Sequence, residues 1–206
     1  MMLKFRNGTN TIIYGMTSSG KTSFMFEVLR KKLITNFPDK IYFFYKVHQK
    51  IFSEWNEDIG NPKINFVEGL QLDLVKEYGG NCVVVIDDLA LENQRGTAEL
   101  FLFGSHHLNI STFFLTQNLF LRDDCFRTMS LNAAYFVLFA NIRSLRQIKT
   151  LSNQIFSGHD TERVMGAYLK ARNTPFGYIV LNLVQNFPQE LVVCTNFLDS
   201  YPSFFL

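Results

Sequence analysis

The chain has 206 residues, of which 47% are hydrophobic and 18% charged, and its formal net charge is +2. This length is enough to bury a sizeable core in one α/β domain, and the small charge does not demand a nucleic-acid partner. The three cysteines, Cys82, Cys125 and Cys194, lack metal-ligand spacing, and we expect reduced thiols in an intracellular protein. No stretch reaches the ~18 apolar residues of a membrane span, and residues 1–10 lack the apolar run of a secretion signal.

Strand and helix patterns alternate along the chain, which is typical of a sheet covered by helices. Short apolar runs predict strands at 11–14, 41–45, 64–67, 82–86, 112–115, 135–139, 178–183 and 191–195, the last two as a terminal hairpin. Helices are predicted at 21–35, 72–78, 97–108, 126–131, 144–156 and 161–170. Between residues 49 and 69 the pattern is weak apart from a turn at 60–62. No repeat, linker or break in composition divides the chain, so we expect a single domain over 1–206.

Aromatic residues are unusually frequent, with 22 Phe in the chain. Many lie in runs such as Phe43-Phe44 and Phe113-Phe114 within predicted strands. Strands that are apolar on both faces are typical of a parallel sheet with helices on both sides. We therefore interpret these rings as core residues and not as platforms for stacking bases.

Residues 15–22, GMTSSGKT, match the phosphate-loop pattern G-x-x-x-x-G-K-[ST], known as Walker A. A predicted strand precedes the motif and a predicted helix follows it, as the pattern requires. Backbone amides of such a loop surround phosphates, and the lysine places positive charge on the β- and γ-phosphates. The residues expected to bind ATP are Gly15, Met16, Thr17, Ser18, Ser19, Gly20, Lys21, Thr22 and Ser23.

An acidic pair, Asp87-Asp88, ends the strongest predicted strand, as in a Walker B motif. Asp87 is expected to hold Mg²⁺ together with the Thr22 hydroxyl. Asp88 is the candidate general base for the attacking water, with Glu92 as the alternative. A pair of solvated aspartates that merely ends a strand is the structural alternative.

Gln117 follows the next apolar strand and is a candidate sensor of the γ-phosphate. In a parallel sheet the carboxyl ends of neighbouring strands meet in one crevice, which places Gln117 near the acidic pair. A turn capped by Gln117-Asn118 is the alternative. Several elements separate Lys21 from Asp87, so the strand of the phosphate loop need not lie beside the acidic strand. This is the arrangement of the additional-strand class of P-loop ATPases.

The sequence resembles the genome-packaging ATPases of double-stranded DNA viruses, of the Maverick/Polinton, adintovirus, virophage and poxvirus type. The resemblance rests on GSHHLNIS at 104–111, LTQNLF at 115–120 and FRTMSLNA at 126–133, and extends to FGY at 176–178 and TNF at 195–197. These ATPases belong to the FtsK–HerA superfamily of ring-forming DNA pumps. The resemblance implies a mainly parallel, RecA-like sheet flanked by helices, with a C-terminal β-hairpin.

The resemblance also implies that an arginine of a neighbouring subunit completes the active site. Relatives often have Asn-Pro-Arg-Asp where this chain has Asn-Ile-Arg-Ser at 141–144, so Arg143 is the first candidate. Arg146 and Arg127 are the other candidates. Asn182 stands where relatives tend to have Asp. His106 and His107 invite a metal interpretation, but no Cys or Asp pair completes a site.

The function implied is an ATP-driven translocase that packages double-stranded DNA into a preformed capsid, working as a ring, pentamer or hexamer, at a capsid or portal vertex. It would act in the infected cell or the virion, with Lys46 and Lys50 as candidate DNA contacts and genome cutting left to another protein. One alternative is a P-loop kinase, with Arg163 and Arg172 over a small acceptor. Another is an assembly protein that binds ATP without translocating DNA.

Overall fold

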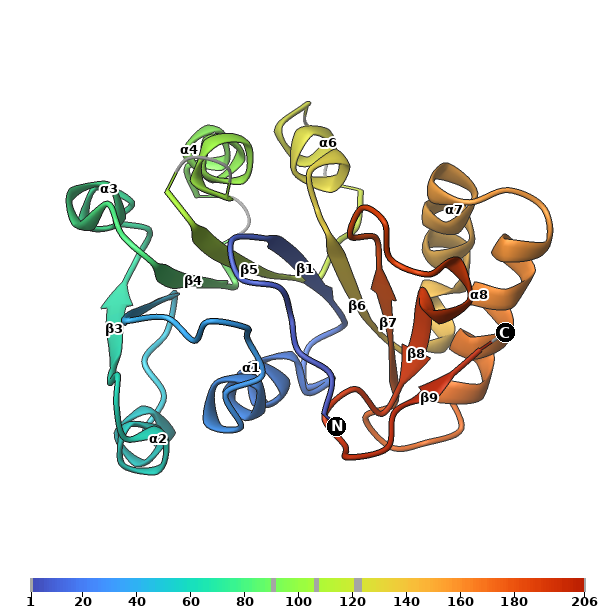
Figure 1. The fold of residues 1–206 in the computed structure, drawn as a ribbon, viewed down its shortest axis with the longest axis horizontal. Coiled ribbons are helices and arrows are strands. Elements are labelled where there is room, and N and C mark those ends of the chain that lie inside the picture. Colours follow the sequence, from blue (N-terminus) through green and yellow to red (C-terminus); the bar gives the residue numbers. More distant parts are fainter. Residues whose placement is uncertain (1, 90–91, 106–107, 121–123, 206) are drawn as a thin grey trace.

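The strands of the computed structural model join into one sheet of nine strands, in the order β3-β2-β4-β5-β1-β6-β7-β8-β9 (Figure 1). The structure describes residues 2–89, 92–105, 108–120 and 124–205. The strands are β1 Asn10–Tyr14, β2 Lys40–Tyr45, β3 Ile64–Glu68, β4 Cys82–Asp87, β5 Ile110–Thr116, β6 Tyr135–Phe139, β7 Tyr178–Asn182, β8 Val193–Thr195 and β9 Ser203–Phe204.

The strands from β3 to β6 in the sheet are parallel, and β5 lies between β1 and β4. Tyr14 of β1 pairs with Thr116 of β5, and Asp87 of β4 pairs with Leu115. The carboxyl ends of the three strands therefore meet at one edge. The strand of the phosphate loop does not lie beside the acidic strand, in agreement with the arrangement expected from the sequence. The strands β7, β8 and β9 continue the sheet in antiparallel pairings, which include the predicted terminal hairpin.

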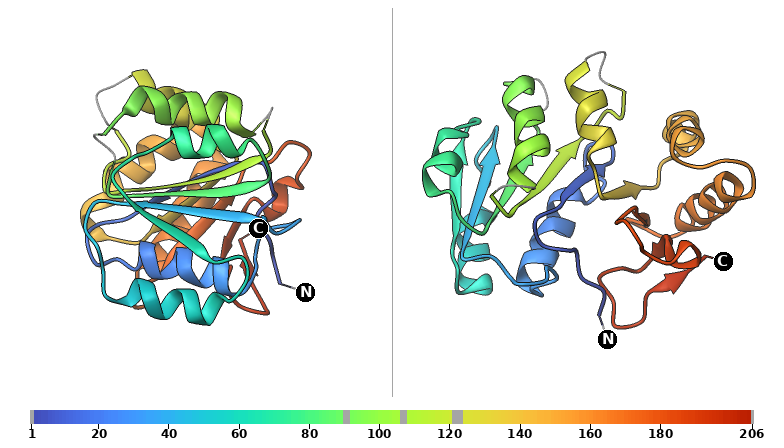
Figure 2. Two further views of the ribbon diagram at one scale, coloured as in Figure 1. Left: turned by 90° about the vertical axis from the view of Figure 1, so that its left-hand side faces the viewer. Right: turned by 45° about the horizontal axis from the view of Figure 1, so that its top comes forward.

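Helices cover both faces of the sheet, as the apolar strands predict (Figure 2). Helices α1 (Lys21–Arg30) and α2 (Ile51–Ile59) lie on one face. The other face is covered by α3 (Asp73–Tyr78), α4 (Gln94–Glu99), α6 (Asp124–Leu131), α7 (Leu145–Ile155) and α8 (His159–Ala171). None of the described helices has the length and apolar character needed to cross a membrane.

Alternation along β4 determines where its acidic end points. Val84 and Ile86 are fully buried in the core under α3 and α4, whereas Val83 and Val85 are fully buried in the core under α1. Because side chains alternate between the faces of a strand, Asp87 belongs to the α1 face. The period of the strand thus brings this carboxylate to the helix that follows the phosphate loop.

The structure corrects three predicted boundaries. The helix predicted at 21–35 ends at Arg30, because Lys32 adopts φ +51° and the chain then bridges Ile34 to Phe5. Residues 51–59, for which no helix was predicted because the pattern is weak, form α2, whose Phe52 and Trp55 are buried. The helix predicted at 97–108 begins at Gln94 and changes at Leu100–Gly104 into a π-helical turn, η1.

Phe5 joins the two ends of the chain within the core of the α1 face. Its fully buried ring lies edge-on to Phe113 of β5 at 5.3 Å and to Tyr135 of β6 at 5.0 Å, measured between ring centroids. It also contacts Phe24 of α1 at 6.4 Å and Phe197, which follows β8, at 4.5 Å. A residue near the start of the chain thus packs against one near its end.

Candidate nucleotide-binding site

The phosphate loop connects β1 to α1 and depends on two glycines. A Cβ on Gly15 would lie 2.3 Å from Ser19 Oγ and 2.8 Å from Phe139 Cβ, distances that a side chain cannot occupy. Gly20, before α1, has φ +99°, a conformation that favours glycine. Ser18 also has a positive φ, +59°, and the amide of Gly15 donates to Thr116 O of β5 at 3.1 Å. The loop is therefore compact and attached to the neighbouring strand.

Lys21 is 6% exposed and its ammonium is held by the loop itself. Its Nζ donates to Gly15 O at 2.8 Å and to Met16 O at 3.2 Å. Burial lowers the pKa of Lys21, and the charges of Asp88 and Asp87 oppose that shift. Ser19 Oγ is buried without a hydrogen-bond partner among the described residues. A buried cation beside an unsatisfied hydroxyl fits an incoming phosphate group.

Asp87 and Thr22 form the candidate magnesium site. Thr22 Oγ1 donates to Asp87 Oδ2 at 2.9 Å across the gap between α1 and β4. Burial raises the pKa of Asp87 to about 6; the Thr22 hydrogen bond lowers it, Asp88 raises it and Lys21 lowers it. Hard oxygen ligands of this kind suit Mg²⁺, and a divalent cation favours the charged carboxylate. The two residues fit the predicted cation.

Asp88, Gln117 and Thr17 form a hydrogen-bonded chain across the carboxyl edge of the sheet. Gln117 Nε2 donates to Asp88 Oδ1 at 2.9 Å, and Thr17 Oγ1 donates to Gln117 Oε1 at 2.8 Å. Asp88 is exposed and adopts φ +56°, so the backbone turns sharply after Asp87 and the two carboxylates diverge. Glu92, the alternative base, is exposed in the turn before α4. The structure brings Asp88, and not Glu92, to Gln117.

Two tyrosines that the sequence analysis missed hold the segment after β6. The buried Tyr14 hydroxyl donates to Gln147 Oε1 at 2.6 Å and lies 2.8 Å from Ser144 Oγ, and burial raises its pKa. The Tyr168 hydroxyl accepts from the amide of Asn141 at 2.9 Å and donates to Phe139 O at 3.1 Å. The segment is thereby connected to the strand that leads into the phosphate loop. Tyr14 directly precedes Gly15 of the phosphate loop, and this position in the sequence could have identified it as a candidate.

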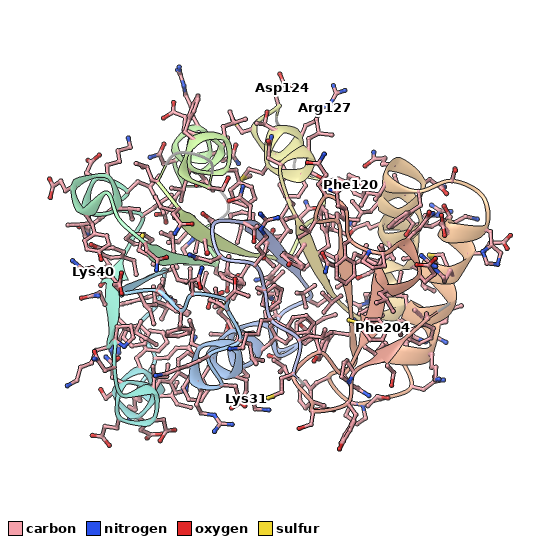
Figure 3. The ribbon with its side chains drawn as sticks, in the orientation of Figure 1. Lys31, Lys40, Phe120, Asp124, Arg127 and Phe204 are labelled. Carbon is pink, nitrogen blue, oxygen red and sulfur yellow. The ribbon has the colours of Figure 1, made fainter. Side chains whose placement is uncertain are left out.

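The three candidate arginines lie apart from these side chains. Arg143, in the short 3-10 helix η2 (Ile142–Ser144), and Arg146, in the first turn of α7, are exposed. Arg127 is exposed in the first turn of α6 and is labelled in Figure 3 at the outer side of that helix. Within the part of the chain that the structure describes, none of the three forms an ion pair. Among the described residues, no carboxylate is paired with any of these arginines.

Other predicted positions have different surroundings. Ser23 faces a cavity beside Phe176, on another side of α1 from Thr22. Lys46 and Lys50 are exposed in the loop between β2 and α2. Asn182 Oδ1 accepts from the amide of Val184 at 3.1 Å and so supports the turn after β7. His106 and His107 lie outside the described residues.

Comparisons with known proteins show a likeness of fold. No protein-family model and no curated protein matches the sequence. The DNA-packaging ATPase B204 from Sulfolobus turreted icosahedral virus is similar, with a TM-score of 0.57 and 15% identity over 88% of this chain and 95% of that chain. The genome packaging NTPase B204 from Sulfolobus turreted icosahedral virus 2, in complex with AMP, gives a TM-score of 0.57 and 11% identity over 97% of this chain and 98% of that chain.

The same NTPase in complex with ATP-gammaS gives a TM-score of 0.50 and 13% identity over 87% of this chain and 95% of that chain. The predicted fold class, a mainly parallel sheet flanked by helices, is confirmed. At the level of fold, the resemblance to viral genome-packaging ATPases is confirmed as well.

Proposed function

We propose that this chain, as a single P-loop ATPase domain over 1–206, hydrolyses ATP to ADP and phosphate and thereby drives double-stranded DNA into a preformed viral capsid. The observation that carries this proposal is the hydrogen-bonded chain from Thr17 through Gln117 to Asp88. It connects the phosphate loop to an exposed carboxylate, which is open to water from solvent. The fold shared with viral packaging NTPases supports the biological setting, an infected cell or a virion.

ATP would bind with its phosphates in the loop from Gly15 to Ser23. Glycines at 15 and 20 let the backbone approach the phosphates, and Lys21 neutralises their charge. Thr22 and Asp87 would hold Mg²⁺, which neutralises charge on the β- and γ-phosphates. Because Lys21 Nζ rests on two carbonyl oxygens of its own loop, it is already positioned before the nucleotide arrives.

Asp88 and Gln117 would act on the attacking water. The Asp88 carboxylate accepts a proton from that water as its oxygen attacks the γ-phosphorus, and the bond to the ADP oxygen breaks. Gln117 holds Asp88 through its amide nitrogen and Thr17 through its amide oxygen, so it is sensitive to both partners. Loss of phosphate would free Gln117 to change these contacts, which is the role of a sensor.

A neighbouring subunit in a ring, pentamer or hexamer, would supply the remaining positive charge. Arg143 is the first candidate, followed by Arg146 and Arg127, and all three are exposed. A trans-acting arginine of this kind contributes about 10³ to 10⁵ in rate. The absence of ion pairs at these arginines among the described residues supports a partner outside the chain.

Double-stranded DNA would be gripped through its phosphates without reading its sequence, because a pump must move every sequence. Lys46 and Lys50 are the proposed contacts, in an exposed loop that also presents Val47, 71% exposed. The ring would sit at a capsid or portal vertex. The kinase alternative gains no support from Arg163, whose side chain is bonded to Gln189 O at 2.9 Å and to Asp160 at 3.4 Å.

The test is ATP hydrolysis by the purified protein with and without double-stranded DNA, alongside Lys21→Ala and Asp88→Asn. Turnover that rises with DNA and disappears in both variants is the expected result. Turnover that is unchanged by DNA but rises with a small hydroxyl acceptor would contradict the proposed packaging function and favour a kinase. Binding of ATP without turnover under any condition would favour an assembly protein.

A further inference from the structure

We propose that Phe176 forms a stacking platform for the purine base of the nucleotide, in an apolar cavity beside the phosphate loop. This inference rests on the proposed binding of ATP at that loop. It adds the part of the site that holds the base, which neither the motifs nor the resemblance located.

The cavity lies where a nucleoside attached to loop-bound phosphates would emerge. Its volume is about 300 Å³. One wall is formed by Gly20, at the N-cap of α1, together with Ser23 and Glu27 of the first two turns of the helix. These residues share one helix face with Phe24, because they are spaced three, four and seven apart. Thr22, which contacts Asp87, points elsewhere. The phosphate site and the cavity therefore lie on adjacent sides of the same helix terminus.

Phe176 is the unusual element of this cavity. Its side chain is 70% exposed, and its backbone adopts φ +54°, a conformation that a bulky residue rarely takes. It lies so close to Gly20 that a Cβ on that glycine would be 3.4 Å from the Phe176 ring. An exposed aromatic ring in a strained turn next to a phosphate loop is expected at a ligand site.

The turn that carries Phe176 is held firmly. A Cβ on the next residue, Gly177, would lie 1.9 Å from Ala171 O, so only glycine fits there. The amide of Gly177 donates to Thr174 O at 3.0 Å, and Gly177 O accepts from the amide of Ala140, after β6, at 2.8 Å. The backbone that carries the ring is therefore held between α8 and β7. Presenting the ring to a base then requires little ordering of the turn.

The rest of the cavity is mainly apolar, and Ser23 and Glu27 are the polar side chains in its wall. Tyr178 packs its ring against Phe24 at 4.9 Å and against Phe139 at 5.5 Å, and its hydroxyl accepts from the amide of Leu198 at 3.2 Å. Both Glu27 oxygens accept from Arg30, at 2.8 and 2.6 Å. Recognition is therefore by stacking and shape. We expect ATP and GTP to bind with similar affinity, and the smaller ring of CTP to bind more weakly.

The experiment compares ATP with inorganic tripolyphosphate, which has phosphates but no base. Dissociation constants of both are measured for the unmodified protein, Phe176→Ala, Phe176→Trp and Tyr201→Ala, a control at an 88% exposed ring that does not line the cavity. Phe176→Ala should weaken ATP about tenfold and leave tripolyphosphate unchanged. Phe176→Trp and Tyr201→Ala should bind both ligands normally.

Each other outcome has a distinct meaning. Unchanged ATP affinity in Phe176→Ala would overturn the base site while leaving the phosphate site intact. Equal weakening of ATP and tripolyphosphate would assign Phe176 to support of the loop and overturn stacking. Failure of the unmodified protein to bind either ligand would overturn the proposed function together with this inference. A preference of about a hundredfold for one purine would contradict recognition by stacking, since every base has an aromatic face.

Discussion

The phosphate-binding side of the proposed site and the arginine-bearing segment after β6 are built in opposite ways. Lys21, Thr22 and Gln117 all have hydrogen-bond partners within one chain. Arg143 and Arg146 are exposed, and neither forms an ion pair within the described residues. From this difference we expect one subunit to be sufficient to bind the nucleotide, and efficient hydrolysis to require a second.

The largest effect is expected at the proposed trans-acting arginine. Arg143→Ala should lower kcat by about 10³ to 10⁵ while ATP affinity stays near normal, because the guanidinium acts on charge that develops in the transition state. Steady-state hydrolysis measures kcat, and nucleotide titration measures the affinity for ATP. Arg95→Ala is the control, since that side chain is 89% exposed on α4.

A mixing experiment tests whether the arginine acts between subunits. Arg143→Ala and Lys21→Ala, each inactive alone, should recover partial turnover when mixed, because some interfaces then combine an intact loop with an intact arginine. If Arg146→Ala or Arg127→Ala shows the large loss and Arg143→Ala does not, the role passes to that residue.

The next largest effect is expected at Asp88, the proposed general base. Asp88→Asn should lower kcat by about 10² to 10⁴ without weakening ATP binding. The substitution is structurally mild, because asparagine tolerates the φ of +56° and its Oδ1 can still accept from Gln117 Nε2. Normal turnover in Asp88→Asn would mean that this carboxylate positions Gln117 and accepts no proton.

Dilution of the unmodified protein should lower hydrolysis, for which we expect two subunits to be needed, and leave nucleotide binding unchanged. For a site shared by two subunits, tenfold dilution below the subunit dissociation constant lowers turnover per chain by about tenfold. The ATP dissociation constant, measured over the same range, should stay constant. Turnover per chain that is independent of concentration, in protein shown to be monomeric by sedimentation, would contradict a shared site.

The smallest effect is expected at Tyr14, which connects the strand before the phosphate loop to the arginine-bearing segment after β6. Tyr14→Phe removes the hydroxyl that lies against Ser144 and Gln147, and should lower the free energy of unfolding by about 1 kcal/mol. Turnover should fall a few-fold, since the arginine segment loses an anchor to β1. Tyr42→Phe is the matched control, because its hydroxyl donates to Leu74 O on α3 at 3.1 Å. Equal turnover in both variants would show that the anchor has no catalytic consequence.

The sequence predicts the parts of the site that are local in the chain. The phosphate loop is one continuous motif, and Asp87 and Gln117 each end an apolar strand, so pattern alone locates them. Contacts between distant residues were not predictable in this way. Thr17 and Gln117 are 100 residues apart, and Tyr14 and Ser144 are 130 apart, so only the order of the strands brings each pair together.

The errors in the predicted fold have similar causes. Leu33 and Ile34 continue the apolar pattern of α1, but pairing with Phe5 draws them out of the helix. Asn10 Nδ2 donates to Phe101 O at 2.8 Å inside η1, a contact that no local pattern in the helix contains. Helix α2 was predictable, because Phe52, Trp55 and Ile59 follow a helical spacing. Strand β9 has two residues, which are too few to show the alternation of apolar and polar residues that predicts a strand.

The position of Phe5 has a consequence for synthesis of the chain on the ribosome. Its ring needs Phe113, Tyr135 and Phe197 to close the core under α1, and all three residues are made long after Phe5. A nascent chain therefore exposes the Phe5 ring until Phe197 has left the ribosome. Chains terminated before Phe197 should keep this aromatic surface exposed and should aggregate or be degraded.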